Sequence, residues 1–254
     1  MIEPRIELQS AFVLQHRKFR ETSLILDVFT RDYGIVSILA KGVRKAKSKT
    51  AALLQPFTAL IISYSNKAEL KILTHVERAQ DAFDLAGMPL YCGFYLNELI
   101  SLLLHKDDPY PELFVDYTNC LYCLTQLTAS SVTNSKSIED SANIFNLSLE
   151  AALRIFELNL LEKVGFALPI QYEAKNQMPI KASARYLFAV GQGVFEHPEG
   201  KISGKTLHAL QKQQFDDEQT LAEAKYLMRS VINFHLNGKA LKTRTFISKM
   251  QTQR

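Results

Sequence analysis

The spacing of hydrophobic positions changes character near residue 80. Before that point, apolar residues form short runs rich in β-branched and aromatic side chains, which is typical of strands. Polar segments separate the runs, and Asp32, Tyr33 and Gly34 form a predicted hairpin turn. Alternation in the last run places Thr74 and Val76 on one face and Leu73 on the other. The five predicted strands cover residues 12–14, 24–29, 35–39, 60–64 and 70–76.

Five short strands within the first 80 residues predict a small closed barrel, with a helical insert near residues 46–54. The OB-fold is such a five-stranded barrel and binds nucleic acids in many settings. An SH3-like barrel would give the same pattern. We expect Phe12, Phe29 and Phe57 to fill the barrel interior.

From residue 89 onward the apolar spacing becomes helical. Leu149, Leu153, Phe156 and Leu160 are separated by four, three and four positions, which predicts a helix with one buried face. The polar segment 128–141 is predicted to be a loop between helices.

The remaining pattern indicates an irregular insert and a final helix. Residues 166–204 contain a possible hairpin over 186–195, and an amphipathic helix is expected over 218–236. The prediction is an α+β protein with an N-terminal OB-fold barrel and a mostly α-helical C-terminal domain. The first domain covers residues 1–80 and binds nucleic acid, and the second covers residues 81–254.

Charge is unevenly distributed along the 254 residues. Residues 1–80 contain 13 Lys and Arg against 7 Asp and Glu, whereas the rest of the chain contains 17 against 19. Residues 224–254 contain no acidic residue. Two basic ends around an acidic middle indicate a polyanionic partner. The C-terminal cations that we expect to contact DNA are Lys239, Lys242 and Arg244.

Two basic clusters fall where loops of the barrel are predicted. The first lies between the first two strands and comprises Arg17, Lys18, Phe19 and Arg20. The second follows the third strand, where Gly42 permits a tight turn, and comprises Lys41, Arg44, Lys45, Lys47 and Lys49. Such loops can bind a strand through its phosphates while an aromatic ring stacks on a base, for which Phe19 is the candidate. A solvated surface kept basic for solubility would show the same residues.

The sequence lacks the motifs of common catalytic and cofactor sites. It contains neither GxxxxGK[ST] nor HExxH, and its six histidines are scattered. Cys120 and Cys123 form one CxxC pair without a second pair downstream, so we read them as buried helical cysteines and expect no metal. Asp107 is read as a residue near a helix start that favours the helix dipole. We therefore expect no enzyme activity and no cofactor.

The cellular compartment is predicted from the apolar stretches, the N-terminal residues and the cysteine content. The longest apolar stretch, 90–104, is short and interrupted by polar residues, and the N-terminus lacks the pattern of a secretory signal. Three cysteines do not make a disulfide framework. We expect a cytoplasmic protein.

Several ordered blocks together resemble the RecO family of DNA repair proteins. In the predicted barrel these are residues 11–14, 21–30, 34, 40–44 and 54–58. In the helical part they are residues 90–91, 95–99, 112–114, 153–154, 156–158, 165, 238–239, 241–242 and 244. The resemblance covers nearly the whole chain. It implies an N-terminal OB-fold, a helical C-terminal domain and a role in recombinational repair near the nucleoid.

The resemblance also implies partners. Members of this family bind single- and double-stranded DNA, anneal complementary strands and, with RecR, help to load RecA onto coated single-stranded DNA. They also bind the acidic, hydrophobic C-terminal tail of the single-stranded DNA-binding protein through the helical domain. Arg154 and Leu158 match the family there, so we expect them to bind the tail. An ion pair of Arg154 with Glu150 or Glu157 is the alternative reading. Many members hold zinc with four cysteines, which residues 165–200 of this chain lack.

Two other functions fit the pattern less closely. One is an RNA-binding OB-fold protein, which would discriminate by the 2′-hydroxyl group. The other is an adaptor whose barrel contacts only proteins, and such an adaptor would not bind bare oligonucleotides.

Overall fold

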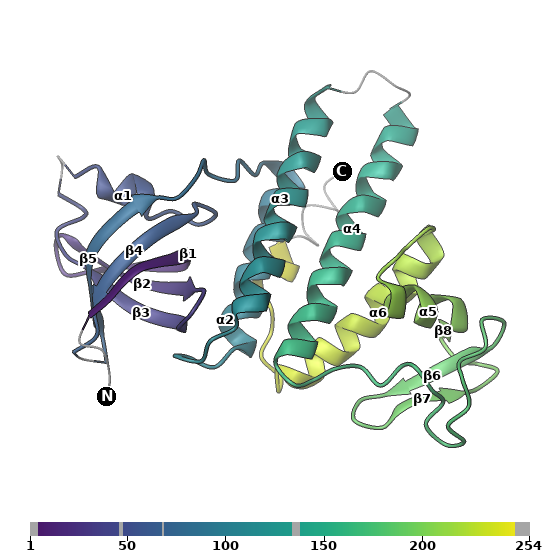
Figure 1. The fold of residues 1–254 in the computed structure, drawn as a ribbon. Helices are drawn as coiled ribbons and strands as arrows, with labels where there is room; N and C mark the ends of the chain where they lie inside the picture. The colour runs from purple at the N-terminus through teal and green to yellow at the C-terminus, as the bar shows by residue number, and fades with distance from the viewer. Residues whose placement is uncertain (1–4, 46–47, 68, 134–137, 247–254) are drawn as a thin grey trace. The chain divides into compact units, whose positions relative to one another are not determined.

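The computed structural model describes residues 5–45, 48–67, 69–133 and 138–246 (Figure 1). The chain forms two compact units. The first contains residues 1–125 together with 243–254, and the second contains residues 126–242. The α+β class predicted from the sequence is confirmed, with a closed barrel followed by helices.

The barrel has the strand order β1-β2-β3-β5-β4, and pairing of β1 with β4 closes it. β3 and β5 pair in parallel, whereas the other neighbouring strands are antiparallel. A short helix, α1 (Thr50–Leu53), lies between β3 and β4, as the sequence predicted. Five strands in this arrangement make an OB-fold. The strands are β1 (Arg5–Phe19), β2 (Ser23–Thr30), β3 (Gly34–Ala40), β4 (Leu60–Ser65) and β5 (Lys71–Arg78).

One strand departs from simple alternation. β4 and β5 pair Ser63 with His75 but Tyr64 with Leu73, so Thr74 is an extra residue in β5. Such a bulge changes the side of the sheet to which the following side chains point. Leu73 and Val76 therefore both pack against the barrel core, and the prediction that placed them on opposite faces was wrong.

None of the three aromatic residues predicted to fill the barrel belongs to its core. The ring of Phe57, which precedes β4, lies 5.1 Å from that of Phe94, and the other two rings lie on the outer side of the barrel. Phe12 and Phe29 are opposite each other in β1 and β2 and are fully buried. Their rings lie 5.3 and 5.4 Å from that of Phe114 and also contact Tyr117. Both partners belong to α3 (Pro111–Thr133). Burial of Phe12 and Phe29 was correctly predicted, but the helix covers them, and smaller residues such as Val13 fill the barrel.

A buried asparagine joins the barrel to the helices that follow it. Asn97 in α2 (Gly87–Leu103) donates from Nδ2 to the Leu14 carbonyl at 2.9 Å. Its Oδ1 accepts a hydrogen bond from the Tyr117 hydroxyl at 2.6 Å. The barrel strands end at Arg78, close to the expected boundary at residue 80. Because of these contacts, however, the compact unit continues to Thr125.

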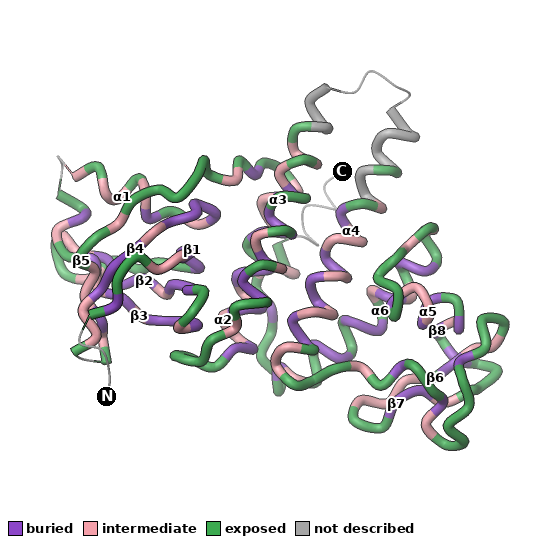
Figure 2. The backbone as a smooth tube through the Cα atoms, viewed as in Figure 1, coloured by how far each residue is buried: buried purple, intermediate pink, exposed green. Residues whose placement is uncertain are grey.

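The second unit combines helices with a small sheet. α4 (Ile138–Lys163) buries the predicted stripe that includes Leu149 and Phe156. The hairpin near residue 190 and the last helix are confirmed, whereas α5 was not foreseen. Buried and exposed stretches alternate along these helices (Figure 2). The other elements are β6 (Arg185–Ala189), β7 (Gly193–Glu196), β8 (Ile202–Ser203), α5 (Gly204–Lys212) and α6 (Glu218–His235).

The polar segment 128–141, predicted as a loop, is largely helical. α3 continues to Thr133 and α4 begins at Ile138, while residues 134–137 lie outside the described part. Within the described ranges, no helix is long and apolar enough to cross a membrane.

Candidate nucleic-acid interface

The two basic clusters of the barrel meet at one edge. The first cluster was predicted to be a loop, but Arg17, Lys18 and Phe19 belong to the end of β1, and only Arg20 lies in the turn. The loop after β3 folds back on the turn after β1, because the Arg44 amide donates to the Thr22 carbonyl at 2.9 Å. The Arg44 guanidinium also donates to the Arg20 carbonyl at 3.3 Å. We name the joined surface the basic rim, and its cationic side chains are all exposed. It comprises Arg17, Lys18, Phe19, Arg20, Lys41, Arg44 and Lys45.

Backbone geometry explains how the second loop turns. Gly42 has a φ of +69°, in the left-handed region that glycine adopts readily, and the Lys45 amide donates to its carbonyl at 3.2 Å. The predicted tight turn at Gly42 is therefore confirmed. Lys49 is exposed just before α1, and Lys47 lies outside the described residues.

Phe19 already has a cation beside it. The ring is half-buried, and the Arg20 guanidinium carbon lies 5.3 Å from the ring centroid. This arrangement is a cation–π contact. A base that stacks on Phe19 must use the part of the ring that Arg20 leaves open or displace Arg20.

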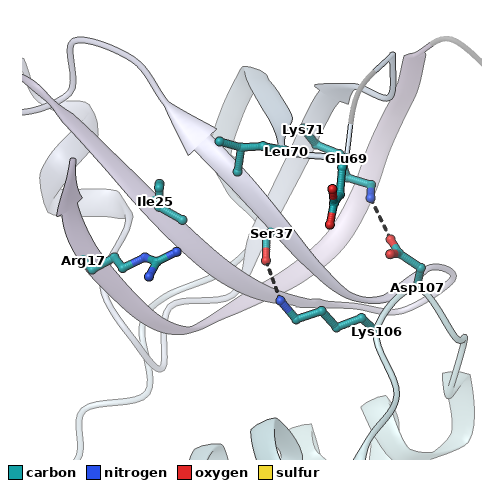
Figure 3. A pocket seen from close by; sticks show the side chains of 8 residues that line it. All are labelled: Arg17, Ile25, Ser37, Glu69, Leu70, Lys71, Lys106 and Asp107. Atoms are coloured by element: carbon teal, nitrogen blue, oxygen red, sulfur yellow. Dashed lines mark hydrogen bonds and ion pairs between the residues drawn. The ribbon is translucent and has the colours of Figure 1, made fainter. Parts of the chain in front are cut away.

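A cavity of about 320 Å³ lies on the outer side of the barrel next to the rim (Figure 3). Arg17 belongs to both surfaces. The cavity is bounded by β1, β2 and β3, by the start of β5 and by the segment that follows α2. Its lining residues are Arg17, Ile25, Ser37, Glu69, Leu70, Lys71, Lys106 and Asp107.

A row of hydrogen bonds crosses the strands beside this cavity. Asp27 accepts from Gln15 Nε2 and from Ser37 Oγ, both at 2.8 Å. Lys106 Nζ then donates to Ser37 Oγ at 3.1 Å. The row fixes Ser37 between a carboxylate and an ammonium group.

The segment after α2 is held against the barrel by backbone and side chain. The Asp107 amide donates to the Ile35 carbonyl at 3.0 Å, and its carboxylate pairs with Lys71 at 2.7 Å. Asp107 thus serves as an ion-pair partner, not as the helix-start residue expected from its position. Burial raises the pKa of Tyr64 in β4, and nearby Tyr33 and Asp107 raise it further.

The expected C-terminal cations divide between the two units. Lys239 and Lys242 are exposed in the second unit. Arg244 belongs to the first unit, where its guanidinium donates to the Tyr95 hydroxyl at 3.4 Å. Thr243 next to it binds the Glu98 carboxylate through its amide and its hydroxyl.

The proposed tail-binding pair has one buried and one half-buried member. Arg154 is 3% exposed and donates to Glu157 at 2.6 Å and to Glu150 at 3.3 Å. Leu158 is half-buried on the same helix. Lys225 of α6 also pairs with Glu150. The alternative ion pairs of Arg154 are thus present, and binding of a tail at these residues stays a prediction.

The cysteine pair is split between core and surface. Cys120 is buried and Cys123 is exposed, so burial was correctly expected for Cys120 only. In the part of the chain that the structure describes, no three His, Cys, Asp or Glu side chains are grouped as metal ligands.

Sequence reasoning found the rim and missed the cavity. Asp27 and Ser37 are polar residues within apolar runs, and that contrast was a usable signal. Nothing in the sequence near Lys71 or Lys106 indicated a role in this cavity, because their contacts with Asp107 and Ser37 depend on the tertiary fold.

Comparison with known proteins agrees with this architecture. The family model described as the recombination protein O N-terminal domain matches residues 5–81, the span of the barrel. The DNA repair protein RecO of Methylococcus capsulatus is 41% identical over 244 residues, which cover 94% of this chain and 92% of the relative. RecO of Coxiella burnetii is 39% identical, covering 96% of this chain and 98% of the relative.

A more distant match has the same extent. The DNA repair protein RecO of Salmonella dublin is 35% identical over 249 residues, which cover 97% of this chain and 96% of the relative. Identity of this level over nearly the full length, together with the OB-fold barrel, shows that the chain belongs to the RecO family of DNA repair proteins.

Proposed function

We propose that this protein binds single- and double-stranded DNA, anneals complementary strands and, with RecR, assists loading of RecA onto coated single-stranded DNA. The observation that carries the proposal is the basic rim. The contact of Arg44 with Arg20 joins cations from the end of β1 and from the loop after β3 at one edge of an OB-fold barrel. Such an edge can follow the phosphates of a strand while bases stack on aromatic side chains.

Annealing requires that two polyanions be brought together, and a protein with two cationic surfaces can hold both. In this proposal the basic rim binds one strand, and Lys239, Lys242 and Arg244 contact the other. Neutralising phosphates releases counterions and lowers the repulsion between strands. Base pairing then supplies the free energy. No covalent bond is made or broken, so the proposal assigns no catalytic residue.

The test of the rim is the salt dependence of binding. If about five phosphates of a single strand are neutralised, the slope of log K against log salt is about −3.5. Replacing Arg44 and Lys45 by Ala removes two of these contacts and should flatten the slope by about 1.4. The matched control replaces two exposed cations of the second unit, Lys175 and Lys212, by Ala, and it should leave the slope unchanged. An unaltered slope in the Arg44 and Lys45 variant would exclude the rim.

The annealing step has its own assay. Complementary labelled oligonucleotides are mixed with the protein, first bare and then coated with single-stranded DNA-binding protein. We expect faster annealing in both cases. Equal or stronger binding to RNA of the same sequence would favour the RNA-binding alternative, because DNA lacks the 2′-hydroxyl group. Failure to bind bare strands would favour the adaptor.

Tail binding can be tested with a labelled peptide of the coating protein. Leu158→Asp places a carboxylate where the acidic tail is proposed to lie, so it should weaken peptide binding and leave DNA binding intact. In Arg154→Ala, Glu157 loses a buried partner, and stability must therefore be measured in parallel. Full-strength peptide binding by both folded variants would remove this site.

A further inference from the structure

We propose that the cavity beside the rim receives one unstacked base of a bound single strand. The inference rests on the proposed DNA binding and extends it from phosphate contact to base contact.

The cavity has an apolar patch and polar edges. Ile25 on β2 and Leu70 before β5 supply the apolar contacts, while Ser37 and Lys106 supply hydrogen-bonding groups (Figure 3). A base has this dual character, with apolar faces and polar edges. At about 320 Å³ the cavity is at the lower end of the roughly 300–1,000 Å³ range of ligand sites. It therefore suits one base and cannot accept a stacked base pair.

The wall formed by Lys71 and the segment after α2 is fixed before any ligand arrives. The Lys71 ion pair with Asp107 and the amide contact of Asp107 with Ile35 hold the segment after α2 on the barrel. The Lys71 side chain is only 11% exposed, so its position is well constrained. Gly34 lies so close to this segment that an added Cβ would be 1.8 Å from the Asp108 carbonyl oxygen. A preformed site avoids the cost of ordering its groups on binding.

The charges around the cavity give a bound nucleotide an orientation. Arg17 lies at the side of the cavity nearest the rim, where its positive charge attracts a phosphate. Lys106 lies on the opposite side of the cavity. Asp107 is neutralised by Lys71, whereas Glu69 repels phosphate from its own side. We infer that the phosphate lies near Arg17 and that the base enters between Ile25 and Leu70.

Continuity with the rim makes a strand, and not a free nucleotide, the expected occupant. Arg17 is both a cation of the rim and a lining residue of the cavity, and it pairs across β1 and β2 with Ile25, another lining residue. A strand held at the rim through its phosphates therefore passes the mouth of the cavity. A paired base is stacked on both faces and would have to leave its duplex to enter, so the cavity favours single strands.

The test compares a wholly abasic strand with the same strand carrying a single base at its centre. Both present the same phosphates, so their affinity ratio measures the contribution of one base. For the wild-type protein we expect the single base to strengthen binding at least about fivefold, since base contacts contribute roughly 1–3 kcal/mol. A ratio of one would overturn the proposal while leaving phosphate binding, and hence the proposed function, untouched.

Blocking variants locate the effect. Ser37→Phe and Leu70→Trp fill the cavity from different walls, so they should bring the ratio to one without weakening the abasic strand. Thr74→Trp, an exposed β5 position that does not line the cavity, is the matched control and should keep the wild-type ratio. Thermal melting confirms that each variant is folded. A fivefold ratio in both folded blocking variants would place the base elsewhere and overturn the proposal.

A competition experiment separates a strand from a free nucleotide. Thymidine monophosphate is added to the wild-type protein with the single-base strand bound. We expect little displacement at millimolar concentration, because the strand is also held by the rim. Full displacement down to the affinity of the abasic strand would show a free-nucleotide site and overturn the assignment to a strand.

Discussion

Replacing Asn97 tests whether a buried amide holds the helices on the barrel. Asn97→Leu keeps the side-chain size but removes the hydrogen bonds to the Leu14 carbonyl and from the Tyr117 hydroxyl. Each of these two buried groups then loses one hydrogen bond, at a cost of about 1–3 kcal/mol. We expect the free energy of unfolding to fall by about 3 kcal/mol in total.

Chemical denaturation followed by circular dichroism measures this change. Asn119→Leu, an exposed position of α3, is the control and should stay within about 0.5 kcal/mol of the wild type. Tyr117→Phe alone should cost about 1–2 kcal/mol, because Asn97 Oδ1 loses its donor. The double variant should cost less than the sum, with a coupling of at least about 1 kcal/mol. A loss below about 0.5 kcal/mol in Asn97→Leu, or additive effects in the double variant, would refute the reasoning.

Three further perturbations follow from single contacts. Burial alone would raise the pKa of Glu223, but hydrogen bonds led by that from Thr206 lower it to about 2. A carboxyl group whose pKa is lowered in the folded state stabilises the fold at pH values above its unfolded pKa of 4.5. The free energy of unfolding should therefore fall by about 2 kcal/mol between pH 5 and pH 2. Denaturation measured over this pH range should show the loss in the wild type and not in Glu223→Gln. Gly34→Ala should destabilise by more than about 3 kcal/mol in thermal melting, because its φ is +62° and Asp108 blocks the added Cβ; a normal melting temperature would contradict this. Tyr64→Phe should stabilise by up to about 1 kcal/mol, since the buried hydroxyl has no hydrogen-bond partner among the described residues, and a measurable loss would show that it has one.

The barrel could be predicted because its local signals and its packing agree. Gly42 and the turn from Asp32 to Gly34 separate runs of β-forming residues. The strands predicted from these runs match the observed strands to within a few residues at most ends. β1 is the exception, since it extends from Arg5 to Phe19 although the strand was predicted only for residues 12–14. Its outer residues are strand because they pair with β2 and β4, which local composition does not reveal.

The predictions that failed depended on contacts between distant residues. Alternation cannot tell the inside of a barrel from an outer face covered by α3, so Phe12 was placed on the wrong side. The bulge at Thr74 needs the β4 register to be seen. The ion pair of Lys71 with Asp107 spans 36 positions, and no periodicity connects them. The cations of the basic rim could be predicted for the opposite reason, because each of its two segments is a cluster of cations that are close in sequence.

The contacts of Thr243 and Arg244 change the meaning of a C-terminal truncation. The chain leaves the first unit after Thr125 and returns to it at Thr243. There Glu98 accepts hydrogen bonds from Thr243, and the Tyr95 hydroxyl accepts one from Arg244. In topological terms the second unit is an insertion within the first. Deleting the residues from Thr243 onward would therefore destabilise the unit that contains the barrel, although the deleted residues are far from the barrel in sequence. Loss of DNA binding in such a truncation could not be assigned to missing C-terminal cations without the point variant Arg244→Ala, which leaves the Thr243 anchor in place.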